Sequence, residues 1–213
     1  MSGRLAVMMP ALNEEEALPA ILAAMPASVD RVVVADNGST DGTVAVARAA
    51  GANVVHEAER GYGAACLAGI RHLASLDVHP EVLVFIDADG SADPLDIERV
   101  AAPILEGSSD FVLGVRKGVD GDVGTILPHA RLGNRLILGL VRLMFRESFD
   151  DLPPFRAIRF SRLLELEMDD RNWGWTLQMQ IRAAGQGLRI VETEVAHRRR
   201  AEGESKISGS LTM

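Results

Sequence analysis

Two aspartates separated by one small residue, Asp87 and Asp89, are well placed in this sequence to bind a metal ion. They follow a run of apolar residues, 82–86, which predicts a strand buried on both faces. Residues i and i+2 of an extended segment point to the same side, so both carboxylates can converge on one cation. Hard oxygen ligands suit Mg²⁺ or Mn²⁺ carrying phosphate oxygens. The alternative is that the aspartates and Gly90 only form a turn after the strand.

The elements that must position these aspartates are short apolar strands alternating with amphipathic helices. This alternation predicts an α/β fold with a mostly parallel, Rossmann-like sheet, flanked by helices and joined by right-handed crossovers. Ligands bind such a sheet at the carboxyl edge of the strands, where Asp87 and Asp89 are expected to lie. The other strands are expected at 5–9 (ended by Pro10), 31–35, 53–56, 111–115, 157–160 and 188–191, the last continuing toward 195.

Local signals also specify helix starts. Asn13 and Glu16 have the spacing of a capping box. Thr40 or Asp41 is expected to cap a helix over residues 43–50. Gly61 precedes a further helix, and a glycine there lets a backbone or a ligand come close.

Composition restricts the classes of function. The 213 residues are expected to form a single domain, with 1–116 as an α/β half of nucleotide-binding type and 117–213 as a C-terminal half with a basic tail. A net charge of −8 argues against a nucleic-acid binder, whereas the local basic group of Arg198–Arg200 and Lys206 indicates a discrete anionic ligand. The single cysteine, Cys66, excludes an internal disulfide and fits a reducing cytoplasm. The oligomeric state is not indicated.

Residues 132–145 are expected to form a strongly apolar helix with interleaved arginines. It is too short to cross a bilayer, but a basic amphipathic helix can lie at a membrane surface. The other interpretation is a core helix whose arginines reach the solvent. No signal segment is recognised at the N-terminus, and the expected location is cytoplasmic. Peripheral contact with the inner face of the membrane follows only from the first of the two interpretations of residues 132–145.

Five motifs occur in order along the chain. They are Pro10-Ala11-Leu12-Asn13-Glu14, Asp36-Asn37-Gly38-Ser39-Thr40-Asp41-Gly42-Thr43, Arg60-Gly61-Tyr62-Gly63, Asp87-Ala88-Asp89 and Gly203-Glu204-Ser205-Lys206. Together they resemble the family 2 glycosyltransferases of GT-A fold, in the branch of dolichyl- and polyprenyl-phosphate mannose and glucose synthases. The resemblance extends from Leu5 to about Ser210. It implies that 1–116 is the nucleotide-sugar-binding half and that 117–213 is the acceptor-side half with the basic tail.

The resemblance implies an inverting transfer of a sugar from a nucleotide diphosphate donor, of GDP-mannose or UDP-glucose type, to an acceptor for which polyprenyl phosphate is the candidate. Glu14 and Asp36 would contact the base or ribose, and the Gly61 loop would lie along the nucleoside. Asp87 and Asp89 would hold Mg²⁺ or Mn²⁺ on the diphosphate. The predicted donor site also includes Pro10, Asn13, Asn37, Ala88 and Arg116, with Arg198 and Lys206 at the phosphates.

Asp150 and Asp151 are the candidate catalytic residues, because the family places an aspartate just before a turn like Pro154-Phe155-Arg156. A carboxylate there could deprotonate an acceptor hydroxyl. A lipid phosphate is already ionised near neutral pH, so toward that acceptor the aspartate would orient rather than abstract. The sequence departs from many relatives in having Gln178 and Gln180 where a glutamate is common, which argues against an acid–base role there.

Other functions share this layout. A sugar-nucleotidyltransferase would carry a glycine-rich, arginine-containing phosphate loop after the first strand, where this chain has the Pro10–Glu14 motif. A catalytically weak nucleotide-sugar-binding protein would fit the amide at Gln178. A retaining relative with a glucosyl-glycerate type of product would differ in the anomeric configuration of that product.

Overall fold

The computed structural model describes residues 4–116 and 152–196. Within them, one seven-stranded sheet has the order β3-β2-β1-β4-β6-β5-β7. β6 is antiparallel to both of its neighbours, and every other pair of adjacent strands is parallel. The predicted mostly parallel α/β sheet is therefore confirmed. The strands are β1 (Leu5–Ala11), β2 (Arg31–Asp36), β3 (Asn53–His56), β4 (Val82–Phe85), β5 (Phe111–Arg116), β6 (Arg156–Arg159) and β7 (Ile190–Val195).

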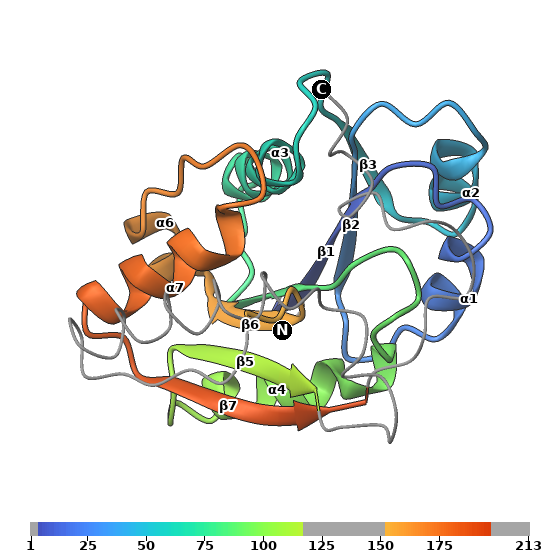
Figure 1. Cartoon of the computed structure of the whole chain (residues 1–213). Helices are drawn as coiled ribbons and strands as arrows, with labels where there is room; N and C mark the ends of the chain where they lie inside the picture. The colour runs from blue at the N-terminus through green and yellow to red at the C-terminus, as the bar shows by residue number, and fades with distance from the viewer. Residues whose placement is uncertain (1–3, 117–151, 197–213) are drawn as a thin grey trace, which may run out of the picture.

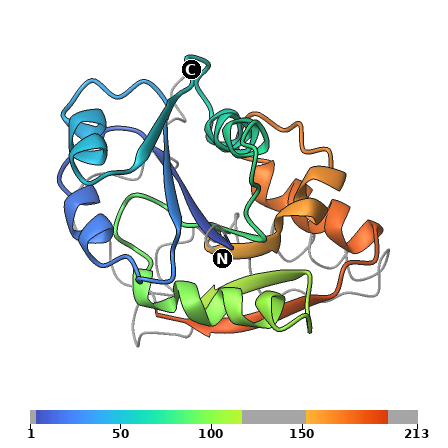
Figure 2. The same cartoon turned by 180° about the vertical axis from the view of Figure 1, so that it is seen from behind.

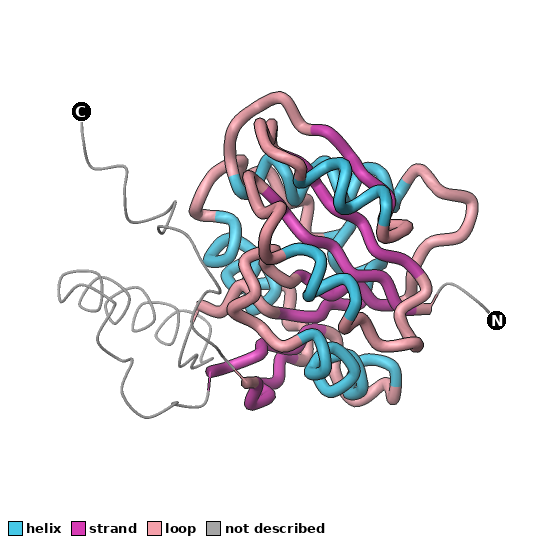
Figure 3. The backbone as a smooth tube through the Cα atoms, turned by 90° about the vertical axis from the view of Figure 1, so that its right-hand side faces the viewer, coloured by secondary structure: helices cyan, strands magenta, loops and turns pink. Residues whose placement is uncertain are grey.

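Helices cover both faces of the sheet (Figures 1 and 2). Helices α3, α6 and α7 pack on one face, and α1, α2 and α4 on the other. Figure 3 shows the strands turning progressively from one edge of the sheet to the other, as the right-handed twist of strands requires. The helices are α1 (Leu18–Ala23), α2 (Thr43–Ala49), α3 (Tyr62–Ala74), α4 (Ile97–Leu105), α6 (Phe160–Glu165) and α7 (Trp175–Gly185), with a 3₁₀ turn η1 (Pro94–Asp96) before α4.

Two hydrophobic cores sandwich the sheet because side chains alternate along each strand. In β4, Leu83 and Phe85 enter the core under α3, α6 and α7, whereas Val82 and Val84 enter the core under α1, α2 and α4. All four side chains are buried. A strand buried on both faces needs the unbroken apolar run from which β4 was predicted.

Pro10 does not end β1, contrary to the prediction from sequence. It lies inside the strand in register with Ala35 of β2. The Met8 carbonyl accepts from the Ile86 N–H on the β4 side, and alternate residues of a strand bond to the same side. The backbone nitrogen of Pro10 therefore lies on the β4 side of β1, but beyond Met8 and Phe85, the last paired residues of the two strands. No ladder donor is missing there, so proline is tolerated.

Asn13 is not a helix cap, and the predicted capping box with Glu16 is wrong. Helix α1 begins at Leu18 without a side-chain cap. Asn13 adopts a left-handed conformation (φ 54°), and its Oδ1 accepts from the Thr40 N–H at 2.8 Å. The side chain thus ties the loop after β1 to the loop after β2.

Helix α2 begins at Thr43, as predicted, but its N-cap residue differs from the prediction. Gly42 occupies the N-cap position, where Thr40 or Asp41 was expected. The Asp41 carboxylate nevertheless accepts from the Thr43 N–H at 3.0 Å, so it satisfies a donor of the first turn. None of the helices within 4–116 and 152–196 is long and apolar enough to cross a bilayer. The expected helix at 132–145 lies outside the described residues.

Candidate functional site

A cavity of about 290 Å³ lies at the carboxyl edge of the sheet, beyond the ends of β1, β2 and β4. The loops after these strands meet there because parallel strands share a carboxyl edge. Seven of the predicted site residues line the cavity: Pro10, Glu14, Asn37, Gly61, Asp87, Ala88 and Asp89.

The structure brings Asp87 and Asp89 to the same cavity. The Asp87 Oδ1 accepts from the Tyr62 hydroxyl at 3.1 Å. The Asp89 Oδ1 accepts from the Ser91 N–H at 2.9 Å, and its side chain is buried. Asp89 therefore also shapes the turn after β4, as the structural alternative predicted.

These two carboxylates fit a hard divalent cation that shares its ligands with a substrate. Among the described residues, no group of three or more His, Cys, Asp or Glu side chains could hold a metal ion. Mg²⁺ is commonly bound through one or two carboxylates, with phosphate oxygens and water completing an octahedron. A pair of aspartates suits a metal that arrives with a diphosphate.

Asn37 fixes the wall of the cavity opposite β4. Its Nδ2 donates to the Glu59 carbonyl at 2.7 Å and to the Glu57 carbonyl at 3.2 Å. Its Oδ1 accepts from the Gly61 N–H at 2.8 Å. Asn37 thus joins the end of β2 to the loop that leads into α3.

The glycines at the start of α3 admit a neighbouring backbone. A Cβ on Gly61 would lie 2.1 Å from the Arg171 carbonyl oxygen, and one on Gly63 would lie 2.1 Å from the Asp170 oxygen. The N–H groups of Gly63 and Ala64 donate to the carbonyls of Asn172 and Arg171. The close approach predicted at Gly61 is therefore made by residues 169–173, which we call the 169–173 segment.

The 169–173 segment is held in place by side chains on both of its sides. The Gln178 Oε1 accepts from the N–H groups of Asp169 and Asp170 at 3.1 and 3.0 Å, and its Nε2 donates to the Asp169 carboxylate. Hydrogen bonds from Gln178 and Arg182 hold the pKa of Asp169 below its usual range. On the α3 side, Arg171 forms an ion pair with Glu59.

Sequence reasoning missed seven residues that line the cavity, and four of them have polar or aromatic side chains: Arg60, Tyr62, Asn172 and Trp173. Tyr62 and Trp173 form a stacked pair, with ring centroids 5.9 Å apart and an interplanar angle of 27°. Burial and the Asp87 carboxylate raise the pKa of Tyr62 well above its usual value, so the phenol keeps its proton. Arg60 and Tyr62 flank Gly61 in its motif, a signal that was available. Trp173 lies just before α7, which begins at Trp175.

Two predicted donor-site residues, Asn13 and Asp36, do not line the cavity. Asp36 is buried and accepts from the Ser39 N–H at 3.0 Å and pairs with His56 Nδ1 at 3.0 Å. Burial raises its pKa, but the hydrogen bonds from Ser39, His56 and Gly38 outweigh burial and hold the pKa below its usual value. In this structure Asp36 shapes the turn after β2.

The remaining predicted residues cannot be compared with the cavity. Arg116 ends β5 at the carboxyl edge of the sheet. Asp150, Asp151, Arg198 and Lys206 lie outside the described residues.

Comparison with known proteins places the chain in a family. The family described as Glycosyl transferase family 2 matches residues 6–166. An uncharacterized glycosyltransferase of Mycobacterium tuberculosis is 42% identical over 96% of this chain and 90% of its own length. An undecaprenyl-phosphate mannosyltransferase of Micrococcus luteus is 33% identical over 98% of this chain and 89% of its own length.

A solved structure with the same fold is the glucosyl-3-phosphoglycerate synthase of Mycobacterium tuberculosis in complex with Mn²⁺, UDP and glucosyl-3-phosphoglycerate. It matches with a TM-score of 0.69 and 26% identity, over 93% of this chain and 73% of that one. The motifs, the sheet and these matches agree. The chain therefore belongs to glycosyl transferase family 2, and it is a glycosyltransferase of GT-A fold.

Proposed function

We propose that the chain transfers a hexose, with inversion, from a nucleotide diphosphate sugar of GDP-mannose or UDP-glucose type to polyprenyl phosphate. The observation that carries this proposal is the convergence of Asp87 and Asp89 on a cavity that Glu14, Asn37 and Gly61 also line. The proposal is supported by the Micrococcus luteus relative, which is named for transfer to undecaprenyl phosphate. Mn²⁺ and UDP bound to the mycobacterial synthase support a metal-assisted donor site.

In this proposal Asp87 and Asp89 hold Mg²⁺ or Mn²⁺ against the donor diphosphate. When the bond between the sugar and the phosphate breaks, negative charge grows on the departing diphosphate, and a divalent cation stabilises that charge. Arg60 lines the cavity, where it donates to the Gly38 carbonyl at 3.3 Å, and we assign its guanidinium a place beside the sugar-nucleotide donor. We assign to Arg116, Arg198 and Lys206 the neutralisation of the negative charge that remains on the diphosphate.

The nucleoside is assigned to the wall made by the loops after β1 and β2. Glu14, Pro10 and Asn37 line this wall, and Gly61 closes it from the α3 side. Asn13 and Asp36 support the wall from behind, through their hydrogen bonds to Thr40 and Ser39. Their direct contact with base or ribose remains a prediction.

The acceptor is assigned to residues 117–213, with Asp150 or Asp151 beside it. A polyprenyl phosphate is ionised near neutral pH, so this aspartate would orient the phosphate and a strong base is not required. We place the reaction at the cytoplasmic surface of a membrane, where such a lipid presents its phosphate.

A transfer assay tests the proposal. Purified protein is incubated with radiolabelled GDP-mannose or UDP-glucose, undecaprenyl phosphate in detergent, and Mn²⁺ or Mg²⁺. We expect a labelled lipid product that disappears with EDTA and falls by at least about 100-fold in Asp89→Asn, because an essential metal ligand is lost. The matched control is Asp93→Asn, which neutralises a carboxylate four residues away that does not line the cavity.

Activity that is unaffected by EDTA and by Asp89→Asn would contradict the metal assignment. Donor binding without transfer to any acceptor would leave only a nucleotide-sugar-binding role. Pyrophosphate release from a sugar-1-phosphate and a nucleoside triphosphate would instead indicate a nucleotidyltransferase.

A small phosphorylated acid is the second candidate acceptor, because the mycobacterial synthase that shares the fold is bound to glucosyl-3-phosphoglycerate. The same assay with 3-phosphoglycerate in place of the lipid separates the two candidates. The anomeric configuration of the product, read by NMR, then distinguishes inversion from retention.

A further inference from the structure

Tyr62 connects a candidate metal ligand to the rim of the cavity. Tyr62 is the first residue of α3, and its hydroxyl donates to Asp87 Oδ1 at 3.1 Å. Its ring stacks on Trp173 at a centroid distance of 5.9 Å. The Trp173 side chain is half exposed, at 51% of its surface. The Tyr62 side chain therefore contacts the candidate metal ligand Asp87 through its hydroxyl and the half-exposed Trp173 through the face of its ring.

The position of Tyr62 is set by well-packed elements. Its ring packs against the core under α3, α6 and α7. The next two residues, Gly63 and Ala64, donate their N–H groups to the 169–173 segment, which leaves no room for a Cβ at Gly63. Gln178 in α7 fixes the other side of this segment. A hydroxyl carried on such a framework can hold a neighbouring carboxylate in one orientation.

We propose that Tyr62 is a positioning residue for the metal ion, and that Trp173 acts on the metal ion through Tyr62. The proposal rests on the proposed function, because it takes Asp87 as a metal ligand. A phenol that donates to Oδ1 restricts rotation of the Asp87 carboxylate before the ion arrives. Partners that orient a metal ligand from behind typically contribute 10- to 100-fold in metal affinity.

The test is a titration of Mn²⁺ against protein saturated with UDP and, separately, with GDP. The readout is the Mn²⁺ concentration that gives half of the nucleotide-dependent rise in melting temperature. Tyr62→Phe keeps the stacked ring and removes the hydroxyl, and we expect it to raise this concentration about 10-fold or more. The matched control is Ser75→Ala, which removes a hydroxyl from the other end of α3, where it donates to the His72 carbonyl. This control should leave the Mn²⁺ midpoint unchanged.

A double-mutant cycle tests the coupling to Trp173. Trp173→Leu alone is expected to raise the Mn²⁺ midpoint severalfold. In the Tyr62→Phe background the same substitution should add no further increase, because its effect on the metal passes through the missing hydroxyl. Additive effects would overturn the coupling and indicate that Trp173 contacts the donor directly.

The outcomes separate this inference from the proposed function. If the wild type binds Mn²⁺ with nucleotide and Tyr62→Phe has the same midpoint, the inference is wrong and the proposed function stands. If the wild type shows no Mn²⁺-dependent rise with any nucleotide diphosphate, the proposed function falls and the inference falls with it. Should Tyr62→Phe fail to fold by circular dichroism, an unchanged Mn²⁺ midpoint in Trp173→Leu, at an exposed position, would overturn the proposal.

Discussion

Gln178 illustrates how one side chain that does not line the cavity can hold in place a segment that does. Its amide accepts two backbone hydrogen bonds from the 169–173 segment and donates one to Asp169. A carboxylate could accept the first two but could not make the third. Only the amide satisfies all three contacts, so Gln178 has a structural role. This agrees with the sequence, which argued against acid–base chemistry at this position.

Replacing this amide by an acid tests that role. In Gln178→Glu the new carboxylate would face Asp169, so we expect a loss of about 1 kcal/mol in the free energy of unfolding and a melting temperature lower by about 2–4 °C. The KM for the donor sugar nucleotide should rise severalfold, with a smaller change in kcat. The control is Gln186→Glu at the end of α7, which also removes one amide hydrogen bond, to the Glu165 carbonyl, but does so at an exposed position and should leave the KM unchanged. A rise in kcat would show instead that this position takes part in acid–base chemistry.

Among single residues, the sequence predicted those that belong to a recognisable motif directly after a strand. Asp87, Asp89, Glu14 and Asn37 line the cavity because each lies just after a strand. Tyr62 was missed although it stands in the Gly61 motif, whereas Trp173 was missed because its importance comes from a contact with Tyr62, more than 100 positions away. No local pattern encodes such a contact.

Among the elements, β6 gives the sheet its least predictable feature. It is a four-residue strand that lies between β4 and β5 and is antiparallel to both. Alternation of strands and helices predicts that β4 and β5 are neighbours, but it does not reveal a later strand inserted between them. Strand 157–160 itself was predicted to within one residue.

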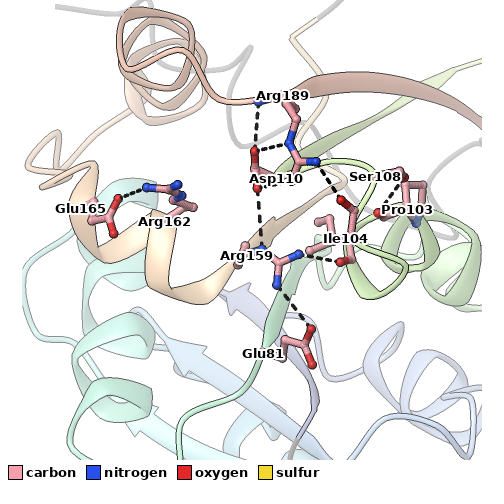
Figure 4. A network of polar contacts seen from close by, with 10 residues as sticks. Glu81, Pro103, Ile104, Ser108, Asp110, Arg159, Arg162, Glu165 and Arg189 are labelled. Atoms are coloured by element: carbon pink, nitrogen blue, oxygen red, sulfur yellow. Dashed lines mark hydrogen bonds and ion pairs between the residues drawn. The ribbon is translucent and has the colours of Figure 1, made fainter.

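A network of charged side chains joins β5, β6 and β7 at the amino edge of the sheet, away from the cavity (Figure 4). Asp110 accepts from the Nε and Nη2 of Arg189, both at 2.9 Å. Arg159 donates to the Ile104 carbonyl at 2.7 Å and to Glu81 at 3.3 Å. The hydrogen bonds from Arg189 hold the pKa of Asp110 at about 2, below its ordinary value of 3.8.

This network predicts how stability depends on pH. Because the folded protein lowers the pKa of Asp110, the contribution is fully present above about pH 4 and is lost as the pH falls toward 2. We expect Asp110→Asn to lower the free energy of unfolding by about 2 kcal/mol at pH 7, and about half of that difference to be lost by pH 3. Urea denaturation of both proteins between pH 7 and pH 3 measures it.

The control for this prediction is Glu165→Gln. Glu165 pairs with Arg162 on the surface of α6, and such exposed pairs contribute little (Figure 4). Its effect should stay below about 0.5 kcal/mol at every pH. A difference between wild type and Asp110→Asn that is constant from pH 7 to pH 3 would contradict the assigned pKa.

At the scale of the whole molecule, the contacts that stabilise the fold and the candidate site lie in different parts of the sheet. Two cores bury its faces, the charged network fastens its amino edge, and the cavity lies at its carboxyl edge. The sequence predicted the buried sheet and the site at its carboxyl edge, because buried strands and the polar loops that follow them are local patterns. It did not predict that the 169–173 segment, from the C-terminal half, would complete the cavity beside α3.

The central claim is that Asp87 and Asp89 together bind a divalent cation with the donor diphosphate. The most direct measurement is a crystal structure with Mn²⁺ and UDP or GDP, with anomalous data that locate the manganese. The account predicts an anomalous peak in the cavity, about 2 Å from an oxygen of each aspartate and from the diphosphate. A nucleotide bound without such a peak, or carboxylates of Asp87 and Asp89 turned away from the ion, would contradict it.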